Sequence, residues 1–507
     1  MLKRVLVNTG SNVAQLVVSM VATFIMAPIY LKLMGHHDYG LREMVLALVG
    51  YMGMLDLGMR PTVSRFASLH NAQNDRQSLL TVYGTSLVFM TLVGVVLGLF
   101  FWIWALSFPE ILNPQGMEED TKYTLFLLLV GAQLMFLFPG FVCESFLEGL
   151  QRYYLKNIIN IFSIIFISVL AYNYMNPANG LALLAFLAAV TTLIKLILFS
   201  VILMRPMVGA IYPNLSLFSR QKLREMLIFG FKSFIQGAAG KVEKMSDRII
   251  IGTLMSPAMI PVYTIPATLV TYMATISMTL SHTFMPLFSD LDARGEQEKS
   301  KTVYLLASKF LVALVVPMGV GIALIGGPFI AIWMSGQFDP ALVDAILGLL
   351  VVYMGVPKLN PFASRYLTAI NKHVIFAKVA PPAALFNLGL SIWLVLEYGV
   401  IGAALGSVLP VFVVTPIFLK VVSDNLGITM LQYVKHAILP AIIPVAAMGG
   451  GLAWWRIEHG LNSYLDIIAA VVVSVVVYGV LYWCISIRKE ERDVLMRLLP
   501  ERFRKSV

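Results

Sequence analysis

Five charged residues lie close together within one predicted helix, and their types and spacing are those of an anion-binding surface. They are Lys241, Glu243, Lys244, Asp247 and Arg248. At about 100° per residue, the three cations fall within roughly 60° of one another, and all five charges share an arc of about 160°. A row of cations on one helix face can bind a phosphate-like anion, and acids in the same place can exchange a proton or a sodium ion.

Two further helices carry candidate residues of the same kind. Asp56 and Arg60 are four residues apart and therefore share a helix face, where they either neutralise each other or join a binding site. Lys358 lies between Pro357 and Pro361, and paired prolines break a membrane helix where it borders a cavity. We therefore expect an anionic substrate to be bound by Arg60, Lys241, Lys244, Arg248 and Lys358, with Asp56, Glu243 and Asp247 as ion-coupling residues or charge partners.

The remaining charges within the predicted spans have simpler interpretations. Lys309, Arg65 and Arg365 lie near cytoplasmic helix ends, where long side chains reach water. For Lys195 the sequence favours neither a side chain that reaches water nor a functional role over the other. Glu144 is interpreted as a solvated helix-end group or a partner of Arg152. Counted together, cations within the spans outnumber acids, so an interior cavity would attract an anion and repel a cation.

The composition places these helices in a membrane. Of the 507 residues, 59% are hydrophobic and only 13% are charged, with a mean hydropathy of +0.82. Soluble proteins carry about 25% charged residues, so a soluble enzyme is excluded. The two cysteines and seven histidines show no metal-ligand spacing, and no phosphate-binding glycine loop is present, so we expect no metal site, no cofactor and no direct use of ATP.

The apolar runs predict an all-α, polytopic integral membrane protein with fourteen transmembrane helices. Each run is long enough to cross about 30 Å of hydrocarbon. Lysines and arginines outside the spans concentrate in alternate connections and in the C-terminal tail, which places both termini in the cytoplasm. The seventh span, 227–255, includes the charged face described above; a turn there would leave an apolar stretch too long for one span and too short for two.

Equal numbers of spans in two parts of the chain predict an internal duplication. Two six-helix lobes would be related by a parallel repeat around a central cavity, followed by two additional helices beside the second lobe. The boundaries are 1–203 for the N-terminal lobe, 204–226 for the cytoplasmic connection, 227–420 for the C-terminal lobe, 421–487 for the additional helices and 488–507 for a basic cytoplasmic tail. We expect the tail to bind anionic membrane lipids and no nucleic acid.

Several segments resemble the polysaccharide transporter (Wzx-type) family of the multidrug/oligosaccharidyl-lipid/polysaccharide exporter superfamily. The resemblance covers roughly the first 420 residues and is carried by LMGHHDYG at 33–40, LDLGM at 55–59, RFA at 65–67, and KMSDRIIIG at 244–252 followed by Val262-Tyr263. It implies a flippase, and no enzyme, in the bacterial inner membrane. Its cargo would be a polyprenyl-pyrophosphate-linked oligosaccharide for O-antigen or exopolysaccharide synthesis, handled with other polysaccharide assembly proteins. A proton or sodium gradient would be the driving force.

Three alternatives remain at this stage. Many family members are similar to twelve-span proteins, so two extra spans point also to the lipid-linked peptidoglycan precursor flippases of the same superfamily. A multidrug or metabolite antiporter would share the fold, although the cationic interior disfavours organic cations as cargo. A membrane-embedded polysaccharide-synthesis enzyme would need a larger extramembrane platform than the short connections provide.

Overall fold

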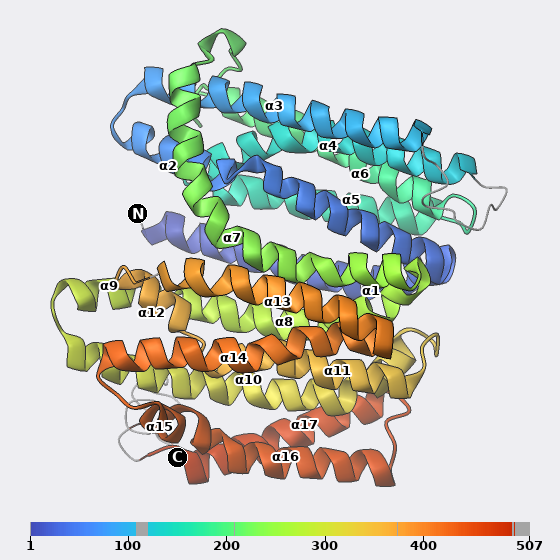
Figure 1. Ribbon diagram of the computed structural model, residues 1–507, viewed down its shortest axis with the longest axis vertical. Helices are drawn as coiled ribbons and strands as arrows, with labels where there is room; N and C mark the ends of the chain where they lie inside the picture. The colour runs from blue at the N-terminus through green and yellow to red at the C-terminus, as the bar shows by residue number, and fades with distance from the viewer. Residues whose placement is uncertain (1, 108–119, 207, 373, 489–490, 492–507) are drawn as a thin grey trace. The chain divides into compact units, whose positions relative to one another are not determined.

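The computed structural model describes residues 2–107, 120–206, 208–372, 374–488 and 491, and within them every regular element is helical (Figure 1). The predicted tail, 488–507, lies outside this description apart from residues 488 and 491. The chain divides into two compact units, Met1–Pro261 and Val262–Val507. Each unit is described by itself below.

Among its described residues, the first unit contains six long helices, α1 and α3 to α7, and the shorter helix α2. α4 packs against α3 and α6, α1 packs against α5 and α7, and α2 packs against α4 and α7. The elements are α1 (Leu2–Met52), η1 (Gly53–Asp56), α2 (Met59–Ala72), α3 (Arg76–Ser107), α4 (Asp120–Gly149), α5 (Tyr153–Tyr174), α6 (Gly180–Met204), η3 (Leu215–Leu217), α7 (Arg220–Leu254) and η4 (Pro257–Met259).

The second unit contains the remaining helices, with α16 and α17 packed on α10 through two apolar clusters. Its elements are α8 (Ile260–His282), α9 (Met285–Ala293), α10 (Gln297–Trp333), α11 (Pro340–Gly355), η5 (Val356–Leu359), α12 (Ala363–Ala369), α13 (Val374–Tyr398), α14 (Val400–Leu426), α15 (Met430–Tyr433), η6 (Val434–Ile438), α16 (Leu439–Glu458), α17 (Tyr464–Leu481) and η7 (Tyr482–Ser486). The first two residues of α8 belong to the first unit.

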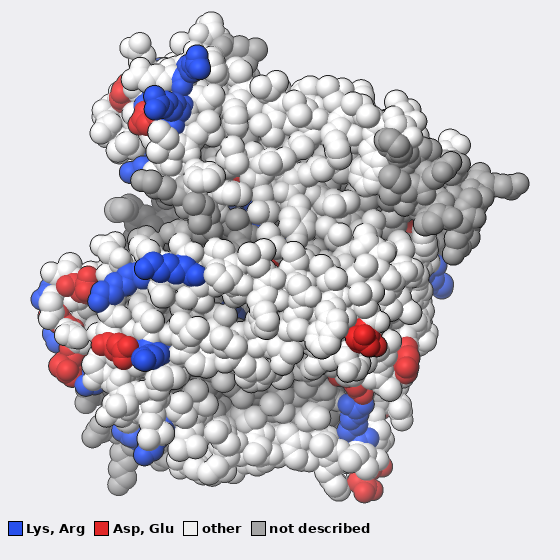
Figure 2. Space-filling model, in the orientation of Figure 1, with Lys and Arg blue, Asp and Glu red and all other residues white. Residues whose placement is uncertain are grey.

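The protein is a multi-pass membrane protein. Twelve segments of the described residues are long and apolar enough to cross a bilayer. On the face drawn in Figure 2, charged side chains gather near the helix ends, and the surface between them is almost free of charge. An apolar belt of this kind is the surface that contacts lipid.

Two of the fourteen predicted spans are not separate segments of this type. The first and second predicted spans share α1, which bends at Gly35, where φ is 73°. A positive φ carries no steric penalty at glycine, so the backbone can bend at Gly35 while the residues before and after it remain helical. The other predicted span without a matching apolar segment is α7, because its charged residues make it too polar to count among the twelve. The count of fourteen stays a prediction.

The division by packing tests neither the predicted lobe boundaries nor the parallel repeat around a central cavity, and both stay predictions. α7 packs against α1 and α2 and falls in the first unit.

Candidate functional site

The second predicted span is broken in its middle. The α-helix ends at Met52, a single 3₁₀ turn leads to Asp56, and Leu57 and Gly58 adopt positive φ angles of 49° and 75° before α2 begins. Asp56 is buried and caps the break, because its Oδ1 accepts a hydrogen bond from the Gly58 N–H at 2.8 Å. Non-helical backbone at membrane depth persists only where it is enclosed by protein or lines a cavity.

A glycine pair brings this break into direct contact with α7. A Cβ atom on Gly58 would lie 2.1 Å from the Gly230 carbonyl oxygen, and a Cβ on Gly230 would lie 2.7 Å from the Leu57 carbonyl oxygen. Any larger residue at either position would push the two backbones apart. α7 itself starts at a cap in which the Ser219 side chain accepts a hydrogen bond from the Lys222 N–H. The crossing therefore fixes α7 against the broken span.

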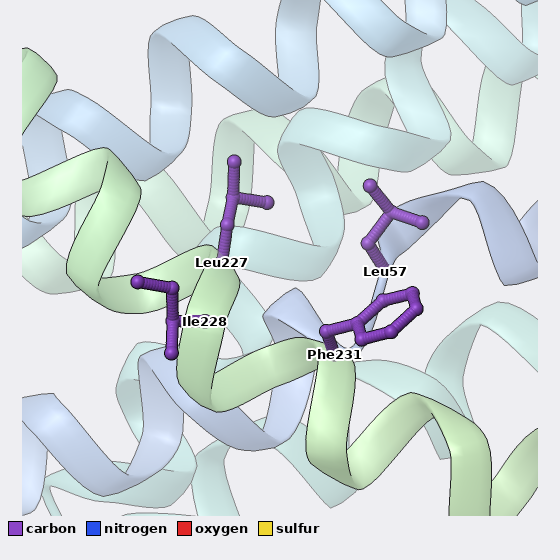
Figure 3. A pocket seen from close by; sticks show the side chains of 4 residues that line it. All are labelled: Leu57, Leu227, Ile228 and Phe231. Atoms are coloured by element: carbon purple, nitrogen blue, oxygen red, sulfur yellow. The ribbon is translucent and has the colours of Figure 1, made fainter.

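An apolar pocket of about 410 Å³ lies at this crossing. It is lined by Leu57, Leu227, Ile228 and Phe231, and Figure 3 shows the Leu57 side chain lying beside the Phe231 ring. Leu57 follows Asp56 directly, so an apolar surface and a buried carboxylate are neighbours along the chain. Such a pocket can accept hydrocarbon.

The Arg60 guanidinium contacts α4 instead of pairing with the Asp56 carboxylate. Its Nη2 lies 3.3 Å from the Glu144 Oε2, and its guanidinium lies 3.8 Å from the centre of the Phe141 ring. Glu144 also accepts a hydrogen bond from the Asn160 amide at 3.4 Å. The predicted shared face of Asp56 and Arg60 is divided because the helix is interrupted between them. The Arg60 side chain remains 41% exposed and accessible to a ligand.

The cations of α7 meet acids from two different helices. The positive charges of Lys241 and Arg60 both act on the Asp56 carboxylate. Arg248 lies farther along α7 and pairs with Glu43 of α1 at 3.1 Å, and Glu43 also binds Arg42 at 2.9 Å. α7 is helical from Lys241 to Arg248, and the binding of an anion by its cations stays a prediction.

The remaining charged residues of this face of α7 are Glu243, Lys244 and Asp247. Asp247 is buried, and Glu243 is half-buried. The Tyr51 hydroxyl donates a hydrogen bond to the Val242 carbonyl oxygen at 3.0 Å, which ties α1 to α7. The side chain of Lys244 lies outside the described residues.

Lys358 belongs to the second unit. The prolines around it break the membrane helix as the sequence predicted, because α11 ends at Gly355 and the 3₁₀ turn Val356–Leu359 follows. The turn is held by the Tyr433 hydroxyl, which donates a hydrogen bond to the Leu359 carbonyl oxygen at 2.8 Å. Of the predicted site residues, Asp56, Arg60, Lys241 and Arg248 lie in the first unit, and Lys358 lies in the second.

The sequence patterns did not identify two acids that pair with candidate cations. Glu43 was unassigned, and Glu144 was interpreted as a solvated helix-end group, yet each holds a cation of the candidate site. Contacts between helices far apart in the chain leave no trace in helical periodicity. The one available signal for Glu144 was that an acid at membrane depth usually has a cationic partner. In the part of the chain that the structure describes, no group of three or more His, Cys, Asp or Glu residues is placed to hold a metal ion.

Helices of this arrangement occur in solved transporters. The lipid II flippase MurJ in an inward closed conformation matches 95% of this chain and 100% of its own, with a TM-score of 0.66 and 15% identity. An inward-facing multidrug resistance transporter of the MATE family matches 82% of this chain and 98% of its own, with a TM-score of 0.65 and 13% identity. This chain therefore shares the fold of these two solved proteins.

The family follows from the sequence itself. Residues 5–292, more than half of the chain, match the family model described as polysaccharide biosynthesis protein. The chain belongs to this family.

Curated relatives agree with that assignment. A putative O-antigen transporter of Shigella flexneri is 23% identical over 73% of this chain and 86% of its own length. A probable low-salt glycan biosynthesis flippase of Haloferax volcanii is 22% identical over 56% of this chain, and the match spans 59% of that relative.

Proposed function

We propose that this protein is a flippase that moves a polyprenyl-pyrophosphate-linked oligosaccharide from the cytoplasmic to the outer leaflet of the bacterial inner membrane, for O-antigen or exopolysaccharide synthesis. The observation that carries the proposal is the helix break at Asp56 and Gly58, which lies against α7 and is followed by the partly exposed Arg60, in a member of the polysaccharide biosynthesis protein family. The protein is a transporter and carries out no covalent step.

The proposed cargo has two chemically different ends, and the first unit offers a surface for each. Its pyrophosphate is bound by Arg60, Lys241 and Arg248, joined by Lys244 of the same helix face. A role for Lys358 in the second unit stays a prediction. Its polyprenyl chain is an apolar ligand, and the pocket at Leu57 and Phe231 has the matching chemistry. An anion-binding group beside hydrocarbon-accepting surface supports a lipid-linked anion over an organic cation.

The direct test is a leaflet-resolved transport assay in proteoliposomes. Fluorescent undecaprenyl-pyrophosphate carrying a defined sugar is placed in both leaflets, and a membrane-impermeant quencher reports its exchange. We expect the purified protein to accelerate exchange over empty liposomes, and to leave a fluorescent phosphatidylcholine unaffected. Exchange of the sugar lipid at the rate of empty liposomes would contradict the proposal.

The driving force is proposed to be a proton or sodium gradient, sensed by Asp56, Glu243 and Asp247. Glu243 and Asp247 lie on α7 with proposed cargo ligands, and Asp56 ends the turn that precedes α2, so the charges of these acids affect cargo binding. Replacing all three by amides is expected to remove the dependence of transport on an imposed gradient. A triple variant that keeps the full gradient dependence would assign coupling to other residues.

Both termini are proposed to lie in the cytoplasm. Single cysteines at Asn179 and Asn462 should react with an impermeant maleimide added to intact cells, whereas cysteines at Asn74 and Gln297 should not. Cys484 is exposed and is first replaced by serine. Labelling at Gln297 from outside would contradict the fourteen-span topology.

A further inference from the structure

A pocket with polar and apolar lining groups lies among α1, α4, α5 and α6 of the first unit, apart from the charged face of α7. Its volume is about 330 Å³, and its polar lining includes Gln15, Gln133, Asn160, Ser163, Thr191 and Lys195. By volume it has room for about eleven water molecules, and it falls at the small end of the range for ligand sites, about 300–1,000 Å³. Polar groups that line a pocket among membrane helices can bind water or a ligand.

Three lining groups have unused hydrogen-bonding capacity. The side-chain amides of Gln15 and Gln133 show no hydrogen bond among the described residues. Lys195 shows no hydrogen bond or ion pair within the part of the chain that the structure describes, although the charges of Glu144 and Arg60 act on it. Amide and ammonium groups thus line the same space, and each is costly to leave unpaired.

The hydroxyl groups of the lining add acceptors. The Ser163 and Thr191 hydroxyls donate hydrogen bonds to carbonyl oxygens of their own helices, those of Ile159 and Leu187, at 2.8 and 2.5 Å. Thr192, also in the lining, does the same to Ala188 at 2.7 Å. Their oxygens are left with free lone pairs that can accept a hydrogen bond from a ligand.

We infer that this cavity binds one sugar residue of the lipid-linked glycan. A sugar hydroxyl both donates and accepts, so it can pair with the Gln133 amide oxygen and with the Lys195 ammonium at once. A fully ionised phosphate has acceptors alone and would leave the Gln133 amide oxygen unpaired. A metal cation would be repelled by Lys195. The inference rests on the proposed function, because it assumes a glycan-bearing cargo.

The cavity is also connected to the proposed pyrophosphate site. Asn160 is hydrogen bonded to Glu144, and Glu144 is paired with Arg60. In the cargo, the first sugar is bonded directly to the pyrophosphate. A pyrophosphate bound at Arg60 would therefore direct this first sugar toward the cavity, while Glu144 links the two sites.

The test compares two lipids that differ only in the sugar. Binding of undecaprenyl pyrophosphate, bare or carrying N-acetylglucosamine or galactose, is measured in nanodiscs by thermophoresis for the wild type and for a Gln133→Leu/Thr191→Val variant. Both substitutions leave the net charge unchanged, so attraction to pyrophosphate is retained. Thr23→Val is the matched control, because the Thr23 hydroxyl also bonds within its own helix, to Ser19 at 2.9 Å, and Thr23 is not part of the lining.

We expect the wild type to bind at least one sugar-bearing lipid more tightly than the bare lipid. The double variant should lose roughly tenfold in affinity for that sugar lipid and less than about twofold for the bare lipid, whereas the control should match the wild type. Equal losses for both lipids, or no loss for either, would overturn the sugar site while leaving the flippase function standing. Failure of the wild type to bind any of the lipids would overturn both.

Discussion

Two ion pairs of the protein, Arg60 with Glu144 and Lys309 with Glu491, differ mainly in the exposure of their cation to solvent. In the first pair the cation is 41% exposed and the acid 14%. In the second the cation is 5% exposed and the acid 16%, their charged atoms are 2.5 Å apart, and the lysine also donates to the Ser486 carbonyl oxygen at 2.8 Å. The same chemistry thus occurs once at an accessible surface and once inside a packed interior.

The difference separates a ligand site from a structural link. A cation that is partly exposed can exchange its carboxylate partner for a phosphate at little cost. A cation enclosed by protein cannot, and removing its partner leaves an uncompensated charge. Exposure, and not charge alone, therefore identifies which intramembrane cations are able to bind cargo.

The largest effect is expected where the buried pair is broken. Lys309→Ala leaves Glu491 without its cation and should lower the free energy of unfolding by about 3 kcal/mol or more. The protein should be less abundant in the membrane and melt at a lower temperature. Lys301→Ala is the control, because Lys301 pairs with Glu298 on the surface of the same helix and should change stability by less than about 1 kcal/mol. Equal melting temperatures for the two variants would refute the distinction.

Lys309 also shows where sequence reasoning reaches its limit. Its position near a helix end predicted a side chain extending to water, whereas the structure encloses it against the end of η7. Composition and helix length were sufficient for the membrane class and the all-helical fold, because those depend on local hydropathy. The partner of Lys309 is far away in the chain, so no local pattern could name it.

The same limit applies to the candidate site. Helical spacing placed the cations of α7 on one face, and the prolines around Lys358 predicted a break that is present. Spacing also placed Asp56 and Arg60 on a shared face, and this was wrong because Leu57 and Gly58 leave the helix between them. The cavity at Lys195 is assembled from four helices and could be recognised only after they were packed together.

The next effect in size concerns the accessible pair. Arg60→Gln should reduce transport of the lipid-linked sugar roughly tenfold, because one charge-assisted contact to phosphate is lost. The melting temperature should change by only a few degrees, since a pair this exposed contributes little to stability. Arg60→Lys keeps the positive charge but cannot donate two parallel hydrogen bonds to phosphate. Its transport rate should therefore lie between those of the wild type and Arg60→Gln. A loss of transport that follows a loss of folded protein would instead make Arg60 structural.

The smallest effect is expected from releasing a cation that is already partly exposed. Glu43 holds Arg248, whose side chain is 36% exposed. Glu43→Gln should free the guanidinium and tighten cargo binding a few-fold, as measured by the concentration of sugar lipid that gives half-maximal transport. An unchanged or weaker apparent affinity would mean that Arg248 serves to join α1 to α7.

The central claim, that cargo travels along the cationic face of α7, is tested most directly by transport per folded molecule in Lys241→Ala and Arg248→Ala. Both proteins are purified, their folded fraction is determined from thermal melting, and leaflet exchange of the undecaprenyl-pyrophosphate sugar is measured in proteoliposomes. The account predicts that each variant folds normally and transports several-fold more slowly than the wild type, with the double variant slower than either. Well-folded single and double variants that transport at the wild-type rate would contradict it.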